Sequence, residues 1–418
     1  MLGLMETLAL TELLGRRVLD AAGEVSGRVR EVAIAPQEDR LHVALLVVRT
    51  KTGDCILQVA QLRPLNGGKL EANTPRPEWL PYIASEGLLL LERDLLDQQI
   101  IDVNGRKVVR VNDAELLQER RNQHVELKMF AVDVGARGAV RRLLRGVVPA
   151  AALRKLVERI PAKMIPWEFV DLIETDPARR VKLKISLEGL ATLHPADIAD
   201  IVEDLSPAER EAVFETLDDE VAAEALEEVD PKLQVSIVND LDSDKAADIV
   251  EEMDPDAAAD LLADLAPERS EEILQEMQPE ERDEVTELLE HEEDTAAGRM
   301  TTDFIALPAI ASVGEAVEHL RAFEGGVESV STIFLVDVDG RLTGAVPLSK
   351  LLLSRPEVDL VRLSTERVIS CDEKARERDV AETFDKYNLL TLPVVDERGV
   401  LTGVITADDI ISLLRSRM

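Results

Sequence analysis

The stretch EEMDPDAAADLLADLAPERS, residues 251–270, places Pro255 and Pro267 twelve residues apart in sequence that is otherwise typical of helix. Proline destabilises a helix interior by about 3 kcal/mol, but it suits the first turn of a helix. The spacing therefore predicts that each proline starts a new short helix. The same stretch carries seven acidic residues against one arginine, so these helices are also strongly charged.

The twelve-residue spacing extends well beyond this stretch. Steps of twelve fall on Pro195, Pro207, Asp219, Pro231, Ser243, Pro255, Pro267 and Pro279. Six of these are proline, and aspartate and serine also suit a helix N-terminus. Ten residues after each step lies an apolar side chain: Leu205, Leu217, Val229, Leu241, Met253, Leu265, Met277 and Leu289. Because twelve residues make about 3.3 helical turns, the apolar stripe of one continuous helix would rotate around its axis. We therefore expect eight short helices stacked as a solenoid with a shared core.

Negative charge is concentrated in the same segment. Residues 195–290 contain 34 Asp or Glu and 5 Lys or Arg, in a chain whose formal net charge is −35. The simplest interpretation is a solvated helix surface with acids near helix N-termini. Charge of this density also destabilises a compact state, so the alternative is a cationic counterpart, either a basic partner or a hard divalent ion. The composition does not separate Mg²⁺ from Ca²⁺.

The totals exclude several classes of protein. A strongly acidic chain repels nucleic acid and anionic membranes, so neither is expected as a partner. Cys55 and Cys371 are the two cysteines, which leaves no disulfide framework or thiolate zinc cluster. We find no secretion signal and no apolar run of the roughly 20 residues that a membrane helix needs. The five histidines are scattered and no nucleophile or phosphate-loop motif occurs, so we expect a cytoplasmic protein without enzymatic activity.

The C-terminal part contains an internal repeat. FLVDVDGRLTGAVPLSKLL (334–352) aligns with LPVVDERGVLTGVITADDII (392–411) at a shift of 59, with Asp337 on Asp396 and Gly344 on Gly403. Each copy predicts a strand, a tight turn, a second strand and a helix. Two such units, each with one exposed sheet face, are expected to pair across that face.

The N-terminal part contains a second repeat. VLDAAGEVSGRVREV (18–32) aligns with IIDVNGRKVVRVNDA (100–114) at a shift of 82, and each copy predicts two strands joined by a tight turn. Asp20 and Asp102 are expected to order these turns by side-chain to backbone bonds. Between this part and the solenoid, the sequence predicts amphipathic helices broken at Pro161 and Pro166, with Trp167 as a packing anchor.

These motifs resemble three known families. The C-terminal repeat resembles the cystathionine-beta-synthase (CBS) domain pair, and LHPADIADIVEDL with HEEDTAAGRMTTDF resembles the cytosolic part of the MgtE magnesium channels. The N-terminal copies resemble the PRC-barrel. Together they imply a multidomain α+β protein with small β-barrel repeats, an all-α superhelical solenoid and an α/β CBS pair. The predicted domains are two barrel repeats at 1–80 and 81–148, a helical linker at 149–190, the solenoid at 191–290 and tandem CBS domains at 291–418 (about 298–356 and 362–418).

The resemblance implies particular site residues. In the MgtE family Mg²⁺ binds in an acidic cleft, and the family's ligands fall here on Glu224, Asp256, Asp260 and Asp409. Further family acids are replaced by Arg376, Arg378 and Asn388, so we expect fewer ions, with arginine filling some places by ion pairing. CBS pairs often bind an adenine nucleotide through [S/T]-x-x-D, which falls on Thr406 and Asp409 in the second copy and on Pro347 and Lys350 in the first. The alternative role of Thr406 is a helix N-cap.

Two functions remain open from the sequence. In the first, the chain is a Mg²⁺-responsive regulator without a pore of its own, because the family's transmembrane domain is not expected here. In the second, it is an adapter that binds a protein or an adenine nucleotide without Mg²⁺ gating. In either case we expect a homodimer through the CBS domains and a protein partner on the barrel repeats, such as a membrane magnesium channel.

Overall fold

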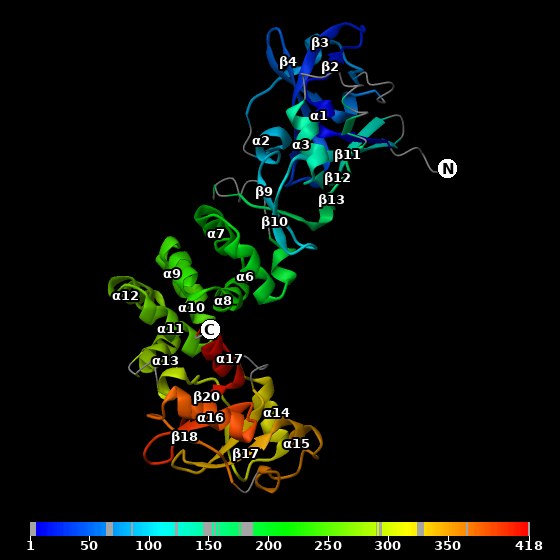
Figure 1. The fold of residues 1–418 in the computed structure, drawn as a ribbon. Helices are drawn as coiled ribbons and strands as arrows, with labels where there is room; N and C mark the ends of the chain where they lie inside the picture. The colour runs from blue at the N-terminus through cyan, green and yellow to red at the C-terminus, as the bar shows by residue number, and fades with distance from the viewer. Residues whose placement is uncertain are drawn as a thin grey trace. The chain divides into compact units, whose positions relative to one another are not determined.

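The computed structural model describes residues 6–63, 70–84, 87–121, 124–144, 153, 156–157, 159–174, 176, 187–289, 291, 295–323, 330–364 and 367–416. The chain forms two compact units, residues 1–221 and 222–418 (Figure 1). The first contains the β-rich part and the start of the helical repeat, and the second contains the remaining helices and the C-terminal repeat. Among the described residues, no helix combines the length and apolar character that crossing a bilayer requires.

The β-rich part of the first unit contains two related sets of strands. The first set is β2 (Arg17–Leu19), β3 (Val25–Ala35), β4 (Asp39–Thr50), β5 (Gly53–Gln58), β6 (Leu70–Glu71) and β7 (Leu80–Pro81). The second is β9 (Gln99–Asp102), β10 (Lys107–Arg110), β11 (Asp113–Arg121) and β12 (His124–Asp133). With β1 (Glu6–Ala9), strands of both sets form a large sheet of strand order β1-β11-β12-β4-β3-β2-β6, and its buried aliphatic side chains form one core.

The turn aspartates act as predicted. Asp20 Oδ1 accepts the backbone N–H groups of Ala22 and Glu24 at 3.0 and 3.1 Å, and Asp102 Oδ1 accepts that of Gly105 at 2.9 Å. The hydroxyl of Ser26 also donates to Asp20, and this bond is the largest influence lowering the pKa of Asp20. Both carboxylates therefore hold tight turns, as the sequence predicted.

The two repeats exchange their leading segments. Strand β1 (Glu6–Ala9) and the short helix α1 (Leu10–Leu13) precede the first repeat, yet β1 pairs with β11 of the second. Likewise β8 (Leu89–Leu90) and α2 (Leu91–Asp94) precede the second repeat, and β8 pairs with β3 of the first. This reciprocal exchange ties the repeats into a single core.

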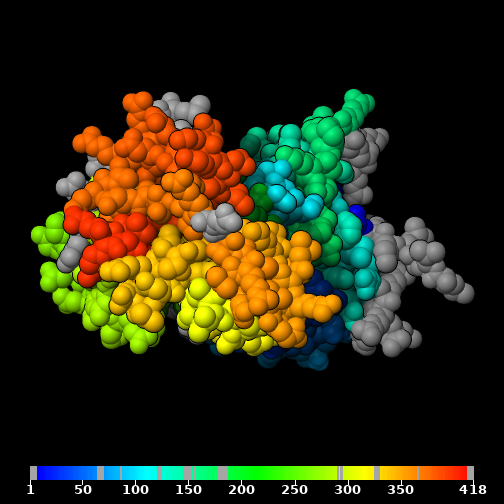
Figure 2. Space-filling model, turned by 90° about the horizontal axis from the view of Figure 1, so that it is seen from below, coloured from blue at the N-terminus to red at the C-terminus, as the bar shows by residue number. Residues whose placement is uncertain are grey.

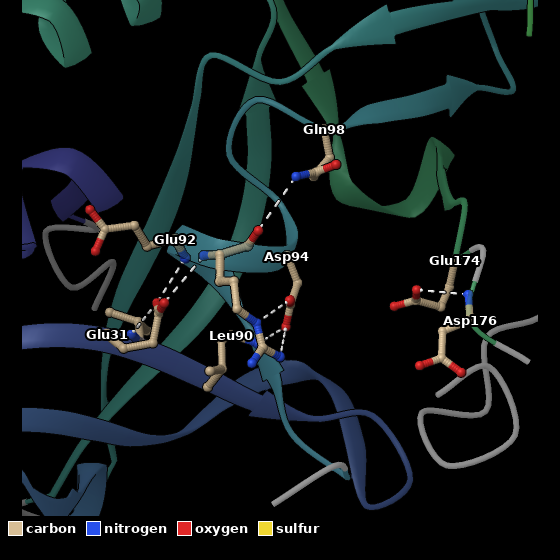
Figure 3. Close-up of polar contacts among 9 residues, drawn as sticks. Glu31, Leu90, Glu92, Asp94, Gln98, Glu174 and Asp176 are labelled. Carbon is tan, nitrogen blue, oxygen red and sulfur yellow. Dashed lines mark hydrogen bonds and ion pairs between the residues drawn. The ribbon is translucent and has the colours of Figure 1, made fainter. Parts of the chain in front are cut away.

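Equivalent buried acids secure both exchanged segments. Glu31 accepts the N–H of Glu92 at 2.7 Å and that of Arg93 at 3.2 Å, and Figure 3 shows its carboxylate directed at Glu92. At a shift of 82, Asp113 accepts the N–H and hydroxyl of Thr11 at 3.1 and 2.5 Å. Burial is the largest cause raising the pKa of each acid. Backbone N–H groups that would otherwise be buried without partners are thereby satisfied.

The segment before the solenoid differs from its prediction. Residues 164–172 form β13 (Met164–Pro166), which pairs with β12, and β14 (Val170–Leu172), which pairs with β9. The helical prediction is wrong for these residues, because edge pairing with existing strands satisfies the backbone and tolerates a proline. Trp167 is an anchor as expected: it packs on the core and its Nε1 donates to the carbonyl of Arg40 at 3.2 Å. The described residues of 145–163 are too few to test the rest of this prediction.

Eight helices begin at the predicted twelve-residue positions. They are α6 (Pro195–Glu203), α7 (Pro207–Phe214), α8 (Asp219–Glu227), α9 (Pro231–Asp240), α10 (Ser243–Glu251), α11 (Pro255–Asp264), α12 (Pro267–Glu276) and α13 (Pro279–Leu289). In the second unit α11 packs against α9 and α13, and α10 packs against α12. The apolar residue ten positions after each start is buried in seven of the eight repeats. The prediction of stacked short helices is confirmed.

The C-terminal repeat also matches its prediction. The first copy contains β16 (Thr332–Val336), β17 (Leu342–Pro347) and α15 (Leu348–Leu352), and the second contains β19 (Thr391–Val395), β20 (Leu401–Thr406) and α17 (Ala407–Ser416). Each sheet is completed by a parallel strand, β15 (Ala306–Pro308) or β18 (Cys371–Asp372), which is followed by α14 (Val313–Arg321) or α16 (Glu377–Tyr387). The copies meet through a small core that includes Phe334 and Val404, and their turns exchange backbone bonds at Gly340 and Gly399.

Candidate functional site

The N-terminal half of α11, with its N-cap, carries three of the acids on which the candidate site depends. Asp254 is the N-cap residue, Asp256 lies directly after Pro255, and Asp260 lies one turn further on. Asp256 is half-buried, whereas Asp260 is exposed. Acids are favoured at a helix N-terminus because they complement its partial positive charge. Residues four apart share a helix face, so Asp256 and Asp260 point to the same side.

The C-terminal repeat brings a second pair of acids to this face. Asp408 and Asp409 lie in the first turn of α17, and Asp409 is among the like charges that raise the pKa of Asp256. In the space-filling view the red C-terminal residues lie beside the lime-green helices of the same unit (Figure 2). Two elements about 150 residues apart in the chain therefore present carboxylates to one another.

The pKa values of these acids reflect burial and mutual repulsion. Burial, and then the charges of Asp409 and Asp254, raise the pKa of Asp256 well above its ordinary value. Burial raises the pKa of Asp409 to about 6, although the bonds from Thr406 act in the opposite direction. The pKa of Asp254 is raised by burial and by Asp303, Asp408 and Glu224. Across the ranges described above, no ion pair joins a cation to Asp254, Asp256, Asp408 or Asp409.

Asp260 has a different environment. Its carboxylate pairs with Arg299 of η5 (Ala297–Arg299), whose Nη1 lies 2.5 Å from Asp260 Oδ2. The same guanidinium donates through Nε to Glu377 at the start of α16, at 3.1 Å. The Glu377 side chain is 8% exposed, so removal of this partner is expected to be costly. One arginine thus joins an acid of the solenoid to an acid of the CBS-like repeat.

Glu224 and Glu227 of α8 also act on Asp254. Glu227 accepts the backbone N–H of Asp254 at 2.7 Å and so caps α11 from a helix three positions earlier. Burial, followed by the charge of Asp254, raises the pKa of Glu227 to about 7. Glu224 is exposed and contributes to the negative potential at Asp254. We refer to Glu224, Glu227, Asp254, Asp256, Asp303, Asp408 and Asp409 as the acidic face.

The acidic face has the chemistry of a hard-cation site, although it is not a finished cage. Within the described ranges no three His, Cys, Asp or Glu side chains converge as ligands of one metal ion. The four sequence-predicted ligands are thus divided: Asp256 and Asp409 are neighbours, Asp260 pairs with Arg299, and Glu224 lies toward Asp254. A cavity of about 70 Å³, lined by Asp256, Asp260, His291 and Met300 among others, adjoins them. It has room for water, and Mg²⁺ keeps several waters when bound. Metal ligation by these residues remains a prediction.

Among the described residues, no ion pair joins Arg376 or Arg378 to a sequence-predicted Mg²⁺ ligand. Arg378 pairs with Glu382 on its own helix at 3.1 Å. Arg376 is the N-cap residue of α16, and its backbone forms a β-bridge with Thr295. Asn388 ends α16 in a left-handed conformation, with φ of 51°. Arg299, which the sequence reasoning did not single out, pairs with the predicted ligand Asp260.

Comparisons with known proteins agree with this architecture. Residues 193–294 match the MgtE intracellular N domain, and residues 296–356 and 359–416 match the CBS domain. The chain carries an MgtE N domain followed by a CBS pair. The magnesium transporter MgtE of Thermus thermophilus is 32% identical over 126 residues, which is 30% of this chain and 28% of that protein. The Bacillus subtilis MgtE is 33% identical over 121 residues, 29% of this chain and 27% of its own length. The matched stretch therefore spans less than a third of either transporter.

Two solved structures extend the similarity over more of the chain. The soluble part of a magnesium transporter aligns with a TM-score of 0.53 and 26% identity, covering 58% of this chain and 94% of that one. The cytosolic domain of the Mg²⁺ channel MgtE in complex with ATP aligns with a TM-score of 0.52 and 29% identity, covering 56% and 94%. These matches place the acidic face on an MgtE N domain and the CBS pair that follows it.

Thr406 and Asp409, the sequence-predicted nucleotide residues, are bonded to each other. Asp409 Oδ2 accepts both the N–H and the hydroxyl of Thr406, each at 2.7 Å, which is a helix cap for α17. In the first CBS copy Lys350 donates instead to the carbonyl of Leu363 at 2.8 Å. The cavity beside Asp409 measures about 10 Å³, whereas ligand pockets are typically hundreds of Å³. The N-cap interpretation of Thr406 describes this geometry, and nucleotide binding remains a prediction.

Sequence reasoning missed several residues of the site. Arg299 lies in the segment HEEDTAAGRMTTDF, where its position gave no signal of an ion pair. Asp303, Asp408 and Glu227 were equally unremarked, because acids are abundant throughout this part of the chain. The repeat offered a signal for Glu227, because glutamate recurs two repeat lengths later at Glu251. Both side chains accept a backbone N–H 27 residues further on, from Asp254 and Gln278.

Proposed function

We propose that this chain is a cytosolic, Mg²⁺-responsive regulatory protein related to the cytosolic gate of MgtE channels. The observation that carries the proposal is the apposition of Asp256 and Asp409, two carboxylates from the N domain and the CBS pair that raise each other's energy. A divalent cation bound at the acidic face would relieve this repulsion and favour the closed arrangement. The role is binding and regulation, with no catalytic step.

The chain's own residues account for the direction of the response. Without a cation, the ionised forms of Asp254, Asp256 and Asp409 repel across the N domain–CBS boundary. A ligand that binds the closed arrangement preferentially shifts the population toward it by its differential affinity. Arg299 holds one point of contact in the absence of metal, so the predicted transition is a loosening of the acidic face rather than complete separation.

Small-angle scattering with Mg²⁺ titration tests the proposal. We expect the radius of gyration of the full chain to fall as Mg²⁺ rises, and the change to be lost in Asp256→Asn. The matched control is Asp264→Asn, which removes the same charge from the exposed C-terminal end of α11. A response that is equal in both variants, or absent in folded wild-type protein, contradicts the proposal. Parallel titration with Ca²⁺ determines which ion is preferred.

The proposed assembly is a homodimer through the CBS pair. Leu352 and Leu353 follow β17 in the first copy and are 85% and 89% exposed, and Ile411, equivalent to Leu352 at a shift of 59, is 65% exposed. Large exposed apolar side chains at matching positions are typical of a symmetric contact. Sedimentation of wild type and Leu352→Asp tests this assembly. A membrane magnesium channel is the proposed downstream partner of the whole protein.

Adenine nucleotide binding is the second candidate. It rests on Thr406 and Asp409 at the β20–α17 junction and on the similarity to the cytosolic domain solved with ATP. Calorimetric titration with ATP and AMP checks it, with Thr406→Ala expected to abolish binding. Heat from ATP in the absence of Mg²⁺ favours the nucleotide function. If binding heat is measured only when Mg²⁺ is added with ATP, the heat can come from Mg²⁺ itself, and the cation proposal stands.

A further inference from the structure

Three arginines stand in register on the outer face of the β-rich part. Arg17 of β2 is directly opposite Arg28 of β3, and Arg28 is directly opposite Arg49 of β4. All three are exposed, and the neighbouring Val18, Val29 and Val48 are buried in the core. Directly paired residues point to the same face of a sheet, so the guanidinium groups form one row. We call Arg17, Arg28 and Arg49 the arginine row.

This arrangement is costly in the absence of a partner. Like charges directly opposite on neighbouring strands destabilise a sheet. Asp54, opposite Arg49, is the acid at the end of the row, and it is shared between Arg49 and Arg30. Across the described residues no ion pair neutralises Arg17 or Arg28; Arg28 donates to the carbonyl of Gly15 at 3.4 Å. The row thus retains positive charge on a chain whose formal net charge is −35.

The second repeat lacks a row of arginines, which indicates that the fold does not require one at these positions. At a shift of 82, Arg17 and Arg28 correspond to Gln99 and Arg110, which are also directly paired. Here the arginine faces an amide, and its Nη1 lies 3.5 Å from the carboxylate of Asp97. The same strand pair is therefore built in this chain with a single, compensated arginine.

We propose that the arginine row docks an acidic α-helix of a partner protein. Neighbouring strands lie about 4.8 Å apart, so the row spans about 10 Å. Acids at positions i, i+3 and i+7 of a helix lie about 4.5 and 10.5 Å along its axis, which matches this span. The β-rich part already makes one contact of this kind: Nη1 of Arg106 lies 2.7 and 3.0 Å from the two carboxylate oxygens of Asp197 on α6. Arginine–carboxylate bonds of this kind are charge-assisted and stronger than neutral ones.

Fluorescence anisotropy on the full chain tests the proposal. The probe is a labelled synthetic helix with glutamate at i, i+3 and i+7, and the matched probe carries glutamine at those positions. We expect the glutamate helix to bind and the double variant Arg17→Gln/Arg28→Gln to weaken it about tenfold or more. The control Arg110→Gln should change affinity less than twofold.

Two results would overturn the proposal. The first is equal affinity for both probes, or no difference between the double variant and the control when circular dichroism shows both to be folded. The second is preferential binding of phosphatidylserine vesicles in a competition experiment, because the row would then belong to a lipid surface. Binding that weakens with added salt and is lost in the double variant supports the acidic helix.

Discussion

Asp256 and Asp260 lie on the same face of one helix, four residues apart, and their surroundings are opposite. Asp260 meets Arg299, which also holds the buried Glu377. Asp256 meets Asp409 and Asp254, and its pKa rises well above the ordinary value. One turn of helix therefore separates Asp260, which is paired with an arginine, from Asp256, which faces other carboxylates. In the proposed function, the Asp260–Arg299 contact joins the N domain and CBS pair permanently, and the Asp256–Asp409 contact joins them only when a cation is bound.

Replacement of Arg299 is expected to have the largest effect on the stability of the ion-free protein. Arg299→Gln removes the guanidinium that pairs with Asp260 and with the buried Glu377, and loss of one partner of a buried ion pair costs up to 3–5 kcal/mol. Because Arg299 is 33% exposed, we expect a loss of about 2 kcal/mol in the free energy of unfolding. Urea denaturation without divalent ions measures it. In Arg299→Gln, added Mg²⁺ should recover part of the lost unfolding free energy. The contact at Asp260 would then depend on the ion, as the contact at Asp256 is proposed to do.

The control for this variant is Arg321→Gln, which breaks the exposed pair with Glu318. Exposed pairs contribute about 0–1 kcal/mol. A loss in Arg299→Gln no greater than in this control would contradict the permanent contact.

Neutralisation of the conditional contact is expected to remove the Mg²⁺ response. A ligand at a hundred times its Kd stabilises the folded state by about 2.7 kcal/mol. In Asp256→Asn this stabilisation should largely disappear, while the ion-free variant melts higher than ion-free wild type because repulsion is relieved. Thermal melts with Mg²⁺ or EDTA measure both effects. Asp264→Asn should keep the full response, and loss in that variant too would point to general screening.

The pH dependence should reveal the same contact. The pKa of Asp409 is raised to about 6 and that of Glu227 to about 7, in both cases chiefly by burial. A carboxyl with a raised folded-state pKa stabilises the fold below its unfolded pKa, near 4, and this contribution is lost as pH rises through 6 and 7. In EDTA we expect the free energy of unfolding to fall between about pH 4 and pH 7.

Mg²⁺ competes with protons for these oxygens, so its stabilising effect should grow over the same pH interval. The slope should be shallower in Asp256→Asn than in Asp264→Asn. A Mg²⁺ effect that is constant from acid to neutral pH would mean that the ion binds elsewhere.

The cap of α17 should give the smallest effect. Thr406→Ala removes the hydroxyl that bonds to Asp409, and loss of an N-cap costs about 1 kcal/mol. The matched control is Ser312→Ala, which removes the cap that pairs with Glu315 at the start of α14. Both variants should lose similar stability in urea denaturation. A change in Mg²⁺ affinity is expected in Thr406→Ala alone, because it frees Asp409; equal affinities would separate the cap from the ion site.

Much of the fold could be predicted because its signals are local. Proline at the first turn fixes where each solenoid helix begins, and Asp20, Asp102, Asp337 and Asp396 hold the turns of repeats that align at shifts of 82 and 59. The exchange of β1 and β8 could not be predicted, because strands of four and two residues carry no record of a distant partner. The strands at 164–172 were missed for the same reason.

The site could be predicted in part. The resemblance indicated Asp256 and Asp409, which the structure brings together, but gave no hint that Asp260 pairs with an arginine 39 residues away. That pairing is set by the packing of the N domain on the CBS pair, which short sequence patterns do not encode. Composition indicated excess negative charge without indicating where a cation was already supplied.

A double-mutant cycle on Asp256 and Asp409 tests the central claim most directly. Each residue is changed to asparagine, singly and together, and the coupling free energy is taken from urea denaturation in EDTA and again in saturating Mg²⁺. We predict a repulsive coupling in EDTA that becomes attractive in Mg²⁺. A coupling of zero in both conditions, or of unchanged sign, would contradict a contact that closes around a divalent ion.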